Sequence, residues 1–96
     1  MLYMVVEHFK PNAASQIYDR ARTVGRQLPK GLEYIDSWVD TDFTRCFQLM
    51  RAEDPAVFDE WIDAWSDLVD FDVIPVHTSR DAAELMRAVP SAIADG

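Results

Sequence analysis

Apolar and polar positions repeat with two different periods along the chain, and together they predict strand, helix, strand, strand, helix, strand. Residues 2–9, 32–40, 45–52 and 71–76 are short runs rich in apolar residues, many of them β-branched or aromatic, which is typical of strands. The polar stretch 41–44 is short enough to join the second and third strands as a hairpin. The pattern therefore predicts one α+β domain.

Apolar residues recurring at spacings of three and four predict the two longer helices. The first is expected to begin at Ala13, with Asn12 as its N-cap. Its apolar stripe consists of Ala14, Ile17, Ala21, Val24 and Leu28. The second is expected to have Asp54 as its cap and Pro55 at its first position. Its apolar side consists of Val57, Phe58, Trp61, Ile62 and Trp65.

A short third helix is predicted after the last strand. Ser79 can cap it, and Pro90 ends it. Its apolar side consists of Ala82, Leu85, Met86 and Val89. We therefore divide the chain into a folded α/β domain over residues 1–78 and a C-terminal part, residues 79–96, with this helix and a loose tail.

The predicted order of elements has one compact solution, the ferredoxin-like β-α-β-β-α-β arrangement. It has an antiparallel sheet of order 4-1-3-2 with two helices on one face. The strands at residues 2–9 and 45–52 are then central, and the other two are edges. Pro75 agrees with an edge position for the last strand, because proline has no N–H to donate to a neighbouring strand.

Both faces of the predicted sheet are apolar, although two helices can cover only one of them. In the first strand Leu2, Met4 and Val6 point one way, whereas Tyr3, Val5 and Phe9 point the other. At ~25 cal/mol per Å², leaving a few hundred Å² of apolar sheet exposed would forgo several kcal/mol of burial. The short third helix could cover part of the second face, but we expect a homodimer packed sheet on sheet.

Composition and charge exclude several classes of protein. A net charge of −8 argues against binding to nucleic acid or to anionic membrane surfaces. No apolar run approaches the roughly 18 residues of a membrane span, and residues 1–6 lack the basic start of a secretory signal. Cys46 is the only cysteine, so no disulfide framework exists, and we expect a cytoplasmic protein.

Four sequence stretches resemble a family of short bacterial proteins known only as domain of unknown function 3303. They are GLEYIDSWV at residues 31–39, RCFQLM at 45–50, WIDAWSDLV at 61–69 and VIPV at 73–76. That family is similar in outline to the dimeric α/β-barrel proteins, which include cofactor-independent monooxygenases, muconolactone-type isomerases and haem-dependent relatives. The resemblance implies the fold and the dimer. It transfers no reaction, because one fold hosts many functions.

Five residues are candidates for a ligand site, namely His8, Asp36, Trp38, Cys46 and Gln48. Pairing residue 40 with residue 45 in the hairpin places Cys46 and Gln48 on one face with Ile35, Ser37 and Val39. It places Asp36 and Trp38 on the other face with Tyr34, Phe47 and Leu49. The five residues therefore cannot all share one pocket.

Each of these candidates also has a structural interpretation. Cys46 is either a nucleophile with His8 as its base or a small buried apolar residue. Asp36 is either a general base or an edge residue that is solvated or paired with an arginine. Gln48 either bonds Ser37 across the hairpin or bonds a ligand.

No metal site and no cofactor are predicted. His8 and His77 are expected at opposite ends of the sheet, and neither C-x-x-C nor H-x-x-x-H spacing occurs.

Three functions follow. The first is binding of a small apolar or aromatic metabolite between sheet and helices, oriented by groups such as Asp36, Gln48 and His8. The second is a cofactor-independent monooxygenase- or isomerase-like enzyme using the same pocket. The third is a structural dimer without ligand, which a packed interior lacking a cavity with at least two polar side chains would favour.

Overall fold

The computed structural model describes residues 1–88 of the 96-residue chain. Its elements are β1 (Leu2–Phe9), α1 (Ala14–Val24), β2 (Leu32–Val39), β3 (Arg45–Ala52), α2 (Val57–Trp65), β4 (Val69–Val76) and α3 (Ser79–Arg87). This order confirms the ferredoxin-like α+β prediction. Val89, Pro90 and the predicted tail lie outside the described residues.

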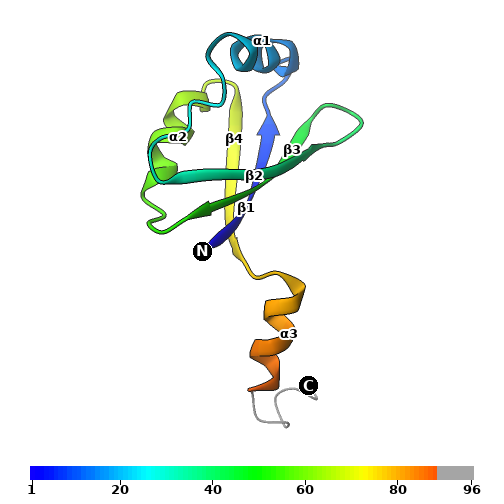
Figure 1. Cartoon of the computed structure of the whole chain (residues 1–96). Helices are drawn as coiled ribbons and strands as arrows, with labels where there is room; N and C mark the ends of the chain where they lie inside the picture. The colour runs from blue at the N-terminus through cyan, green and yellow to red at the C-terminus, as the bar shows by residue number, and fades with distance from the viewer. Residues whose placement is uncertain (89–96) are drawn as a thin grey trace.

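The four strands form one antiparallel sheet in the order β2-β3-β1-β4, which is the predicted order (Figure 1). β1 and β3 are central, and Pro75 lies on the edge strand β4. Between β2 and β3 the register pairs Val39 with Cys46 and Ser37 with Gln48, as predicted.

A bulge in β2 corrects the predicted face of Tyr34. The register shifts between Tyr34 and Asp36, so Ile35 is an extra residue in the strand. The Tyr34 hydroxyl lies 2.6 Å from Ser37 Oγ, so both side chains occupy the same face. The expectation that Tyr34 shares a face with Asp36 is therefore wrong, because strict alternation fails at a bulge.

One face of the sheet packs against α1 and α2. On β1 the buried residues are Tyr3, Val5 and Glu7, which alternate with more exposed neighbours. The helices add Ile17, Phe58, Trp61 and Trp65 to the same core. An edge-to-face stack runs through it, from Tyr3 to Phe58 at 5.0 Å and from Phe58 to Trp61 at 6.4 Å between ring centroids.

α1 is shorter than its apolar pattern predicts. It ends at Val24 because Gly25 takes φ 70° and ψ −164°, a backbone conformation that essentially only glycine adopts. Leu28 therefore lies in the following loop and not on the helix. Asn12 is not the N-cap either, since its φ is 61° and the cap position belongs to Ala13.

The other two helices also begin one or two residues away from the predicted positions. α2 begins at Val57, and the Asp54 carboxylate accepts a 2.9 Å bond from the Ala56 N–H in the turn before it. α3 is capped by Thr78 in place of Ser79, with the hydroxyl oxygen accepting from the Asp81 N–H at 3.0 Å.

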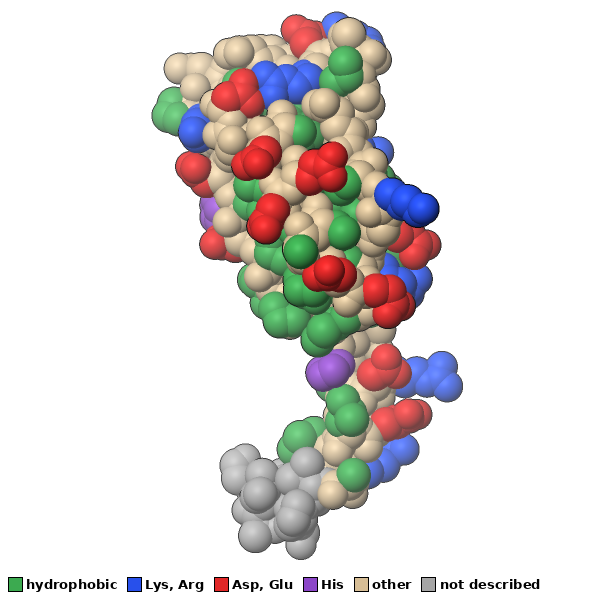
Figure 2. Space-filling view, turned by 90° about the vertical axis from the view of Figure 1, so that its left-hand side faces the viewer, with side chains coloured by type: hydrophobic (Ala, Val, Ile, Leu, Met, Phe, Trp, Pro, Cys, Tyr) green, Lys and Arg blue, Asp and Glu red, His purple; other side chains and the backbone are tan. Residues whose placement is uncertain are grey.

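α3 does not cover the second face of the sheet. It projects from the end of β4, away from the body of the domain (Figures 1 and 2), and has no buried residue along Ser79–Arg87. The apolar residues of that second face therefore lie uncovered within residues 1–88. We call this surface the open face, and it consists of Leu2, Met4, Val6, Trp38, Phe47, Leu49 and Ile74. Trp38 and Ile74 are 53% and 46% exposed.

None of the helices within residues 1–88 combines the length and apolar character required to cross a membrane.

Candidate functional site

A partly open cavity of about 200 Å³ lies between the sheet and the two helices that cover it. We call it the sheet–helix pocket. Its apolar wall consists of Phe9, Ile17, Ala21, Val39, Trp61, Trp65 and Val69. Its polar lining consists of Glu7, Tyr18, Arg26, Ser37, Cys46 and Gln48. The interior therefore contains a cavity with more than two polar side chains, as both ligand hypotheses require.

Glu7 and Gln48 form the floor of this pocket, at positions where a core would normally hold apolar side chains. β1 and β3 run antiparallel, and their register pairs Glu7 with Cys46 and Val5 with Gln48. Glu7 is only 7% exposed and Gln48 only 6%. A carboxyl and an amide are thus held side by side in the two central strands, beneath the helices.

Burial raises the pKa of the Glu7 carboxyl above its usual range, because desolvation disfavours the charged form. Hydrogen bonding with Gln48 and Cys46 and the positive charge of Arg26 oppose this shift. Within residues 1–88 no arginine, lysine or histidine forms a salt bridge with Glu7. The pocket therefore holds an acid with altered proton affinity, which is common at binding and catalytic sites.

Gln48 carries the buried polar atom that lacks a partner. Its Oε1 accepts no hydrogen bond from the described part of the chain. The expected partner, Ser37, lies opposite it, but the Ser37 hydroxyl bonds the Tyr34 hydroxyl at 2.6 Å. An unpaired buried acceptor costs about 1–3 kcal/mol, so a molecule that donates to this oxygen would recover part of that cost.

Cys46 is buried beside Glu7, and the arrangement does not activate it. Burial, followed by the charge and hydrogen bonding of Glu7, raises the pKa of Cys46 to about 12. A nucleophilic cysteine needs the opposite shift. The proposed base, His8, is bonded to Asp72 at 2.9 Å and does not line the pocket. These observations favour the structural interpretation of Cys46.

Arg26 stands at the mouth of the pocket and is anchored twice. Its carbonyl oxygen accepts bonds from the Nε1 atoms of Trp61 and Trp65, both at 3.0 Å. Its guanidinium lies 3.6 Å from the centre of the Tyr34 ring. Gly25 makes this possible, because its positive φ turns the chain from the end of α1 toward the two indoles. Arg26 is the one cation in the pocket lining found within residues 1–88.

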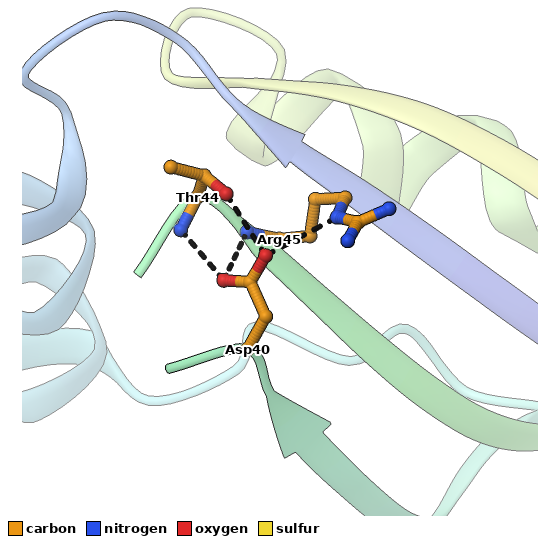
Figure 3. Close-up of polar contacts among 3 residues, drawn as sticks. All are labelled: Asp40, Thr44 and Arg45. Carbon is orange, nitrogen blue, oxygen red and sulfur yellow. Dashed lines mark hydrogen bonds and ion pairs between the residues drawn. The ribbon is translucent and has the colours of Figure 1, made fainter. Parts of the chain in front are cut away.

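The hairpin loop between β2 and β3 contacts the pocket lining through one aromatic pair. The Asp40 carboxylate closes this loop by accepting bonds from Thr44 N–H (2.8 Å), Thr44 Oγ1 (2.9 Å), Arg45 N–H (3.1 Å) and Arg45 Nε (3.2 Å), as Figure 3 shows. The loop presents Phe43, whose ring packs edge-on against Tyr18 at 6.5 Å. Tyr18 in turn lines the pocket, and burial raises its pKa.

The structure divides the five predicted site residues between two surfaces. Gln48 and Cys46 line the sheet–helix pocket. Asp36, Trp38 and His8 do not, and all three are exposed. The Asp36 carboxylate accepts from the Ser37 N–H at 2.8 Å. Asp36 and His8 are therefore not part of the sheet–helix pocket, and Asp36 and Gln48 lie on different surfaces.

Sequence reasoning missed Glu7, Arg26 and Tyr18 as pocket residues. A signal for Glu7 was present, because it follows Tyr3 and Val5 at the period of two that marks one face of a strand. A carboxylate at such a core position is uncommon unless it is paired or functional. Arg26 and Tyr18 gave no such signal, since arginine and tyrosine occur widely on exposed helices and loops.

The fold and this site define a small ferredoxin-like α+β protein with a polar-floored pocket beneath its two packed helices. The chain belongs to the family described as Domain of unknown function (DUF3303), which matches residues 1–90. No curated protein and no solved structure matches the sequence.

Proposed function

We propose that this protein is a homodimer that binds a small apolar or aromatic metabolite in the sheet–helix pocket. The observation that carries the proposal is that Glu7 and Gln48 both lie buried on the floor of a cavity walled by Trp61 and Trp65. Polar groups in such positions lower stability, so a function is the simplest reason for them. An apolar cavity with a few convergent polar groups is the usual form of a ligand site.

The size of the pocket limits the ligand. Sites for drug-sized molecules span roughly 300–1,000 Å³. The sheet–helix pocket holds about 200 Å³. A molecule with one ring fits this volume better than a fused polycyclic one.

The open face supports the dimer. It places Trp38, Ile74 and their apolar neighbours on one continuous surface, which α3 leaves uncovered within residues 1–88. Large exposed apolar patches on small proteins usually mark an interface. A second copy packed sheet on sheet would cover the same residues in both subunits, as in a dimeric α/β barrel.

Glu7 favours a second candidate, a cofactor-independent enzyme of the isomerase kind. A buried carboxyl with a raised pKa is suited to take a proton from a bound molecule and return it at another position. Cys46 offers no comparable support as a nucleophile, since its thiol is held protonated.

Filling the pocket tests the binding proposal. Ala21 lines the pocket, so Ala21→Leu should displace a bound molecule without changing the sheet. Ala83→Leu adds the same volume to the exposed side of α3 and serves as the control. With phenol as the probe and chemical-shift titration as the readout, we expect binding to the wild type and to Ala83→Leu, and a loss of at least tenfold in Ala21→Leu. Equal affinity in all three proteins would contradict the proposal.

Solvent exchange separates the two candidates. If Glu7 moves protons, a small cyclic ketone bound in the pocket should exchange C–H protons in D₂O faster with the wild type than with Glu7→Gln. A ligand-binding protein without catalysis would give the same slow exchange with both.

A further inference from the structure

The floor of the sheet–helix pocket offers hydrogen-bond acceptors. Gln48 Oε1 accepts from no group within residues 1–88, and the Glu7 carboxyl lies on the same floor. The hydroxyl that could have satisfied Gln48, on Ser37, is engaged by Tyr34 at 2.6 Å. The group complementary to this floor is therefore an O–H or N–H donor.

The mouth of the pocket has the opposite character. Arg26 is exposed, and no carboxylate of the described chain lies within 4.0 Å of its guanidinium. Arg20, Arg22, Arg45 and Arg51, by contrast, each form an ion pair. Stacking on the Tyr34 ring at 3.6 Å restricts the orientation of the planar Arg26 guanidinium. A guanidinium held in one orientation is suited to bind both oxygens of a carboxylate.

The space between floor and mouth is narrow and aromatic. Trp61, Trp65 and Phe9 line it, and the volume of about 200 Å³ is below the range for larger ligands. A single planar ring satisfies both conditions. Such a ring would also keep its two polar groups apart, so that one reaches the buried floor and the other stays at the mouth.

We infer that the sheet–helix pocket binds a single-ring carboxylic acid that carries a hydroxyl or amino donor at the far end of the ring. Its carboxylate pairs with Arg26, and its donor bonds Gln48 Oε1 and the Glu7 carboxyl. This inference rests on the proposed function and specifies its ligand class. It also explains how a chain of net charge −8 would attract an anion, because the charge that matters is the local one at the mouth.

Three probes test each end of the ligand separately, namely 4-hydroxybenzoate, phenol and benzoate. A charge-assisted hydrogen bond contributes about a tenfold change in affinity. The wild type should therefore bind 4-hydroxybenzoate about tenfold more tightly than phenol, which lacks the carboxylate. It should prefer 4-hydroxybenzoate over benzoate, which lacks the donor, by a similar factor.

Two variants assign the preferences to residues. Arg26→Gln should remove the preference for 4-hydroxybenzoate over phenol and keep its preference over benzoate. Gln48→Met should remove the preference for 4-hydroxybenzoate over benzoate and keep its preference over phenol. Arg26→Lys keeps the charge and should keep most of the first preference, which protects the test against a folding defect in Arg26→Gln. Arg22→Gln is the control, since Arg22 lies on α1 one turn before Arg26 but pairs with Asp19 at 2.6 Å and does not line the pocket.

The outcomes separate this inference from the proposed function. If the wild type binds phenol and 4-hydroxybenzoate equally, the inferred ligand class is wrong, but the proposed binding of a small aromatic molecule in the pocket still holds. If Arg26→Gln weakens all three probes alike, Arg26 acts only as a structural partner of Tyr34, and the inference is overturned. If none of the probes binds at millimolar concentration, the proposed function fails with it.

Discussion

Replacing Trp38 with serine tests the proposed dimer directly. Trp38 is 53% exposed on the open face, where it lies on the edge strand β2 and pairs with Phe47 of β3. A tryptophan side chain can bury up to about 250 Å², so this exposure leaves about 130 Å² available to a partner. At ~25 cal/mol per Å², covering it is worth about 3 kcal/mol in each subunit, or about 6 kcal/mol in a two-fold dimer.

Only part of this gain would appear as affinity, because side-chain ordering and imperfect packing oppose it. If half is realised, Trp38→Ser weakens the dimer by about 3 kcal/mol, which is about a hundredfold in dissociation constant. The folding of each subunit should change little, because Trp38 is absent from the buried core.

Sedimentation equilibrium from micromolar to millimolar concentration measures the effect. The wild type should have twice the 11.0 kDa mass of the chain, and Trp38→Ser should dissociate over this range. Phe43→Asn is the matched control, because Phe43 is equally exposed at 57% but lies on the hairpin loop. Its φ of 58° is one that asparagine tolerates.

Two results would contradict an interface on the open face. One is a well-folded wild type that remains a single 11.0 kDa particle at every concentration. The other is a Trp38→Ser protein that associates as strongly as the wild type, which would place the interface elsewhere.

Three further predictions concern two residues of the pocket lining and the hairpin loop. Gly25→Ala should lower the free energy of unfolding by about 1–3 kcal/mol in urea titrations, because alanine is strained at φ 70° and ψ −164°. Cys46, with its pKa raised to about 12, should react with iodoacetamide at pH 8 about a thousandfold more slowly in the folded protein than in urea, as mass spectrometry would show. Hydrogen bonds from Thr44 and Arg45 lower the pKa of Asp40 in the folded protein. The stability that Asp40 contributes is therefore complete above the pKa of the unfolded state, and it is lost as pH falls through the lower pKa of the folded state. Thermal midpoints of the wild type and Asp40→Asn should therefore differ most at neutral pH and converge in acid.

The order and kind of the strands followed from local patterns. Apolar runs, the short loop at residues 41–44 and Pro75 each restrict the backbone within a few residues, so they predict strands, a hairpin and an edge without knowledge of the rest of the chain. The family resemblance pointed to the same fold. The bulge after Tyr34 and the positive φ of Asn12 and Gly25 do not follow from local patterns. Such backbone conformations cost free energy, and they persist only where contacts elsewhere in the fold offset that cost.

The candidate site was predictable only in part. Gln48 and Cys46 could be placed on one face from the hairpin register alone, since side chains alternate along a strand. Which face the helices cover could not be read from a sheet that is apolar on both sides. That choice decides that Gln48 is buried and Asp36 is exposed.

Local sequence patterns thus specify the elements, the sheet order and the two apolar faces, because these depend on the period of neighbouring residues. The packing of the whole chain fixes where the pocket lies and which charges meet in it. Glu7, Arg26 and Gln48 come from β1, the loop after α1, and β3, and only the pairing of β1 with β3 and the two indole bonds to the Arg26 carbonyl bring them together. Contacts between segments so far apart in the chain arise from packing, which no local pattern encodes.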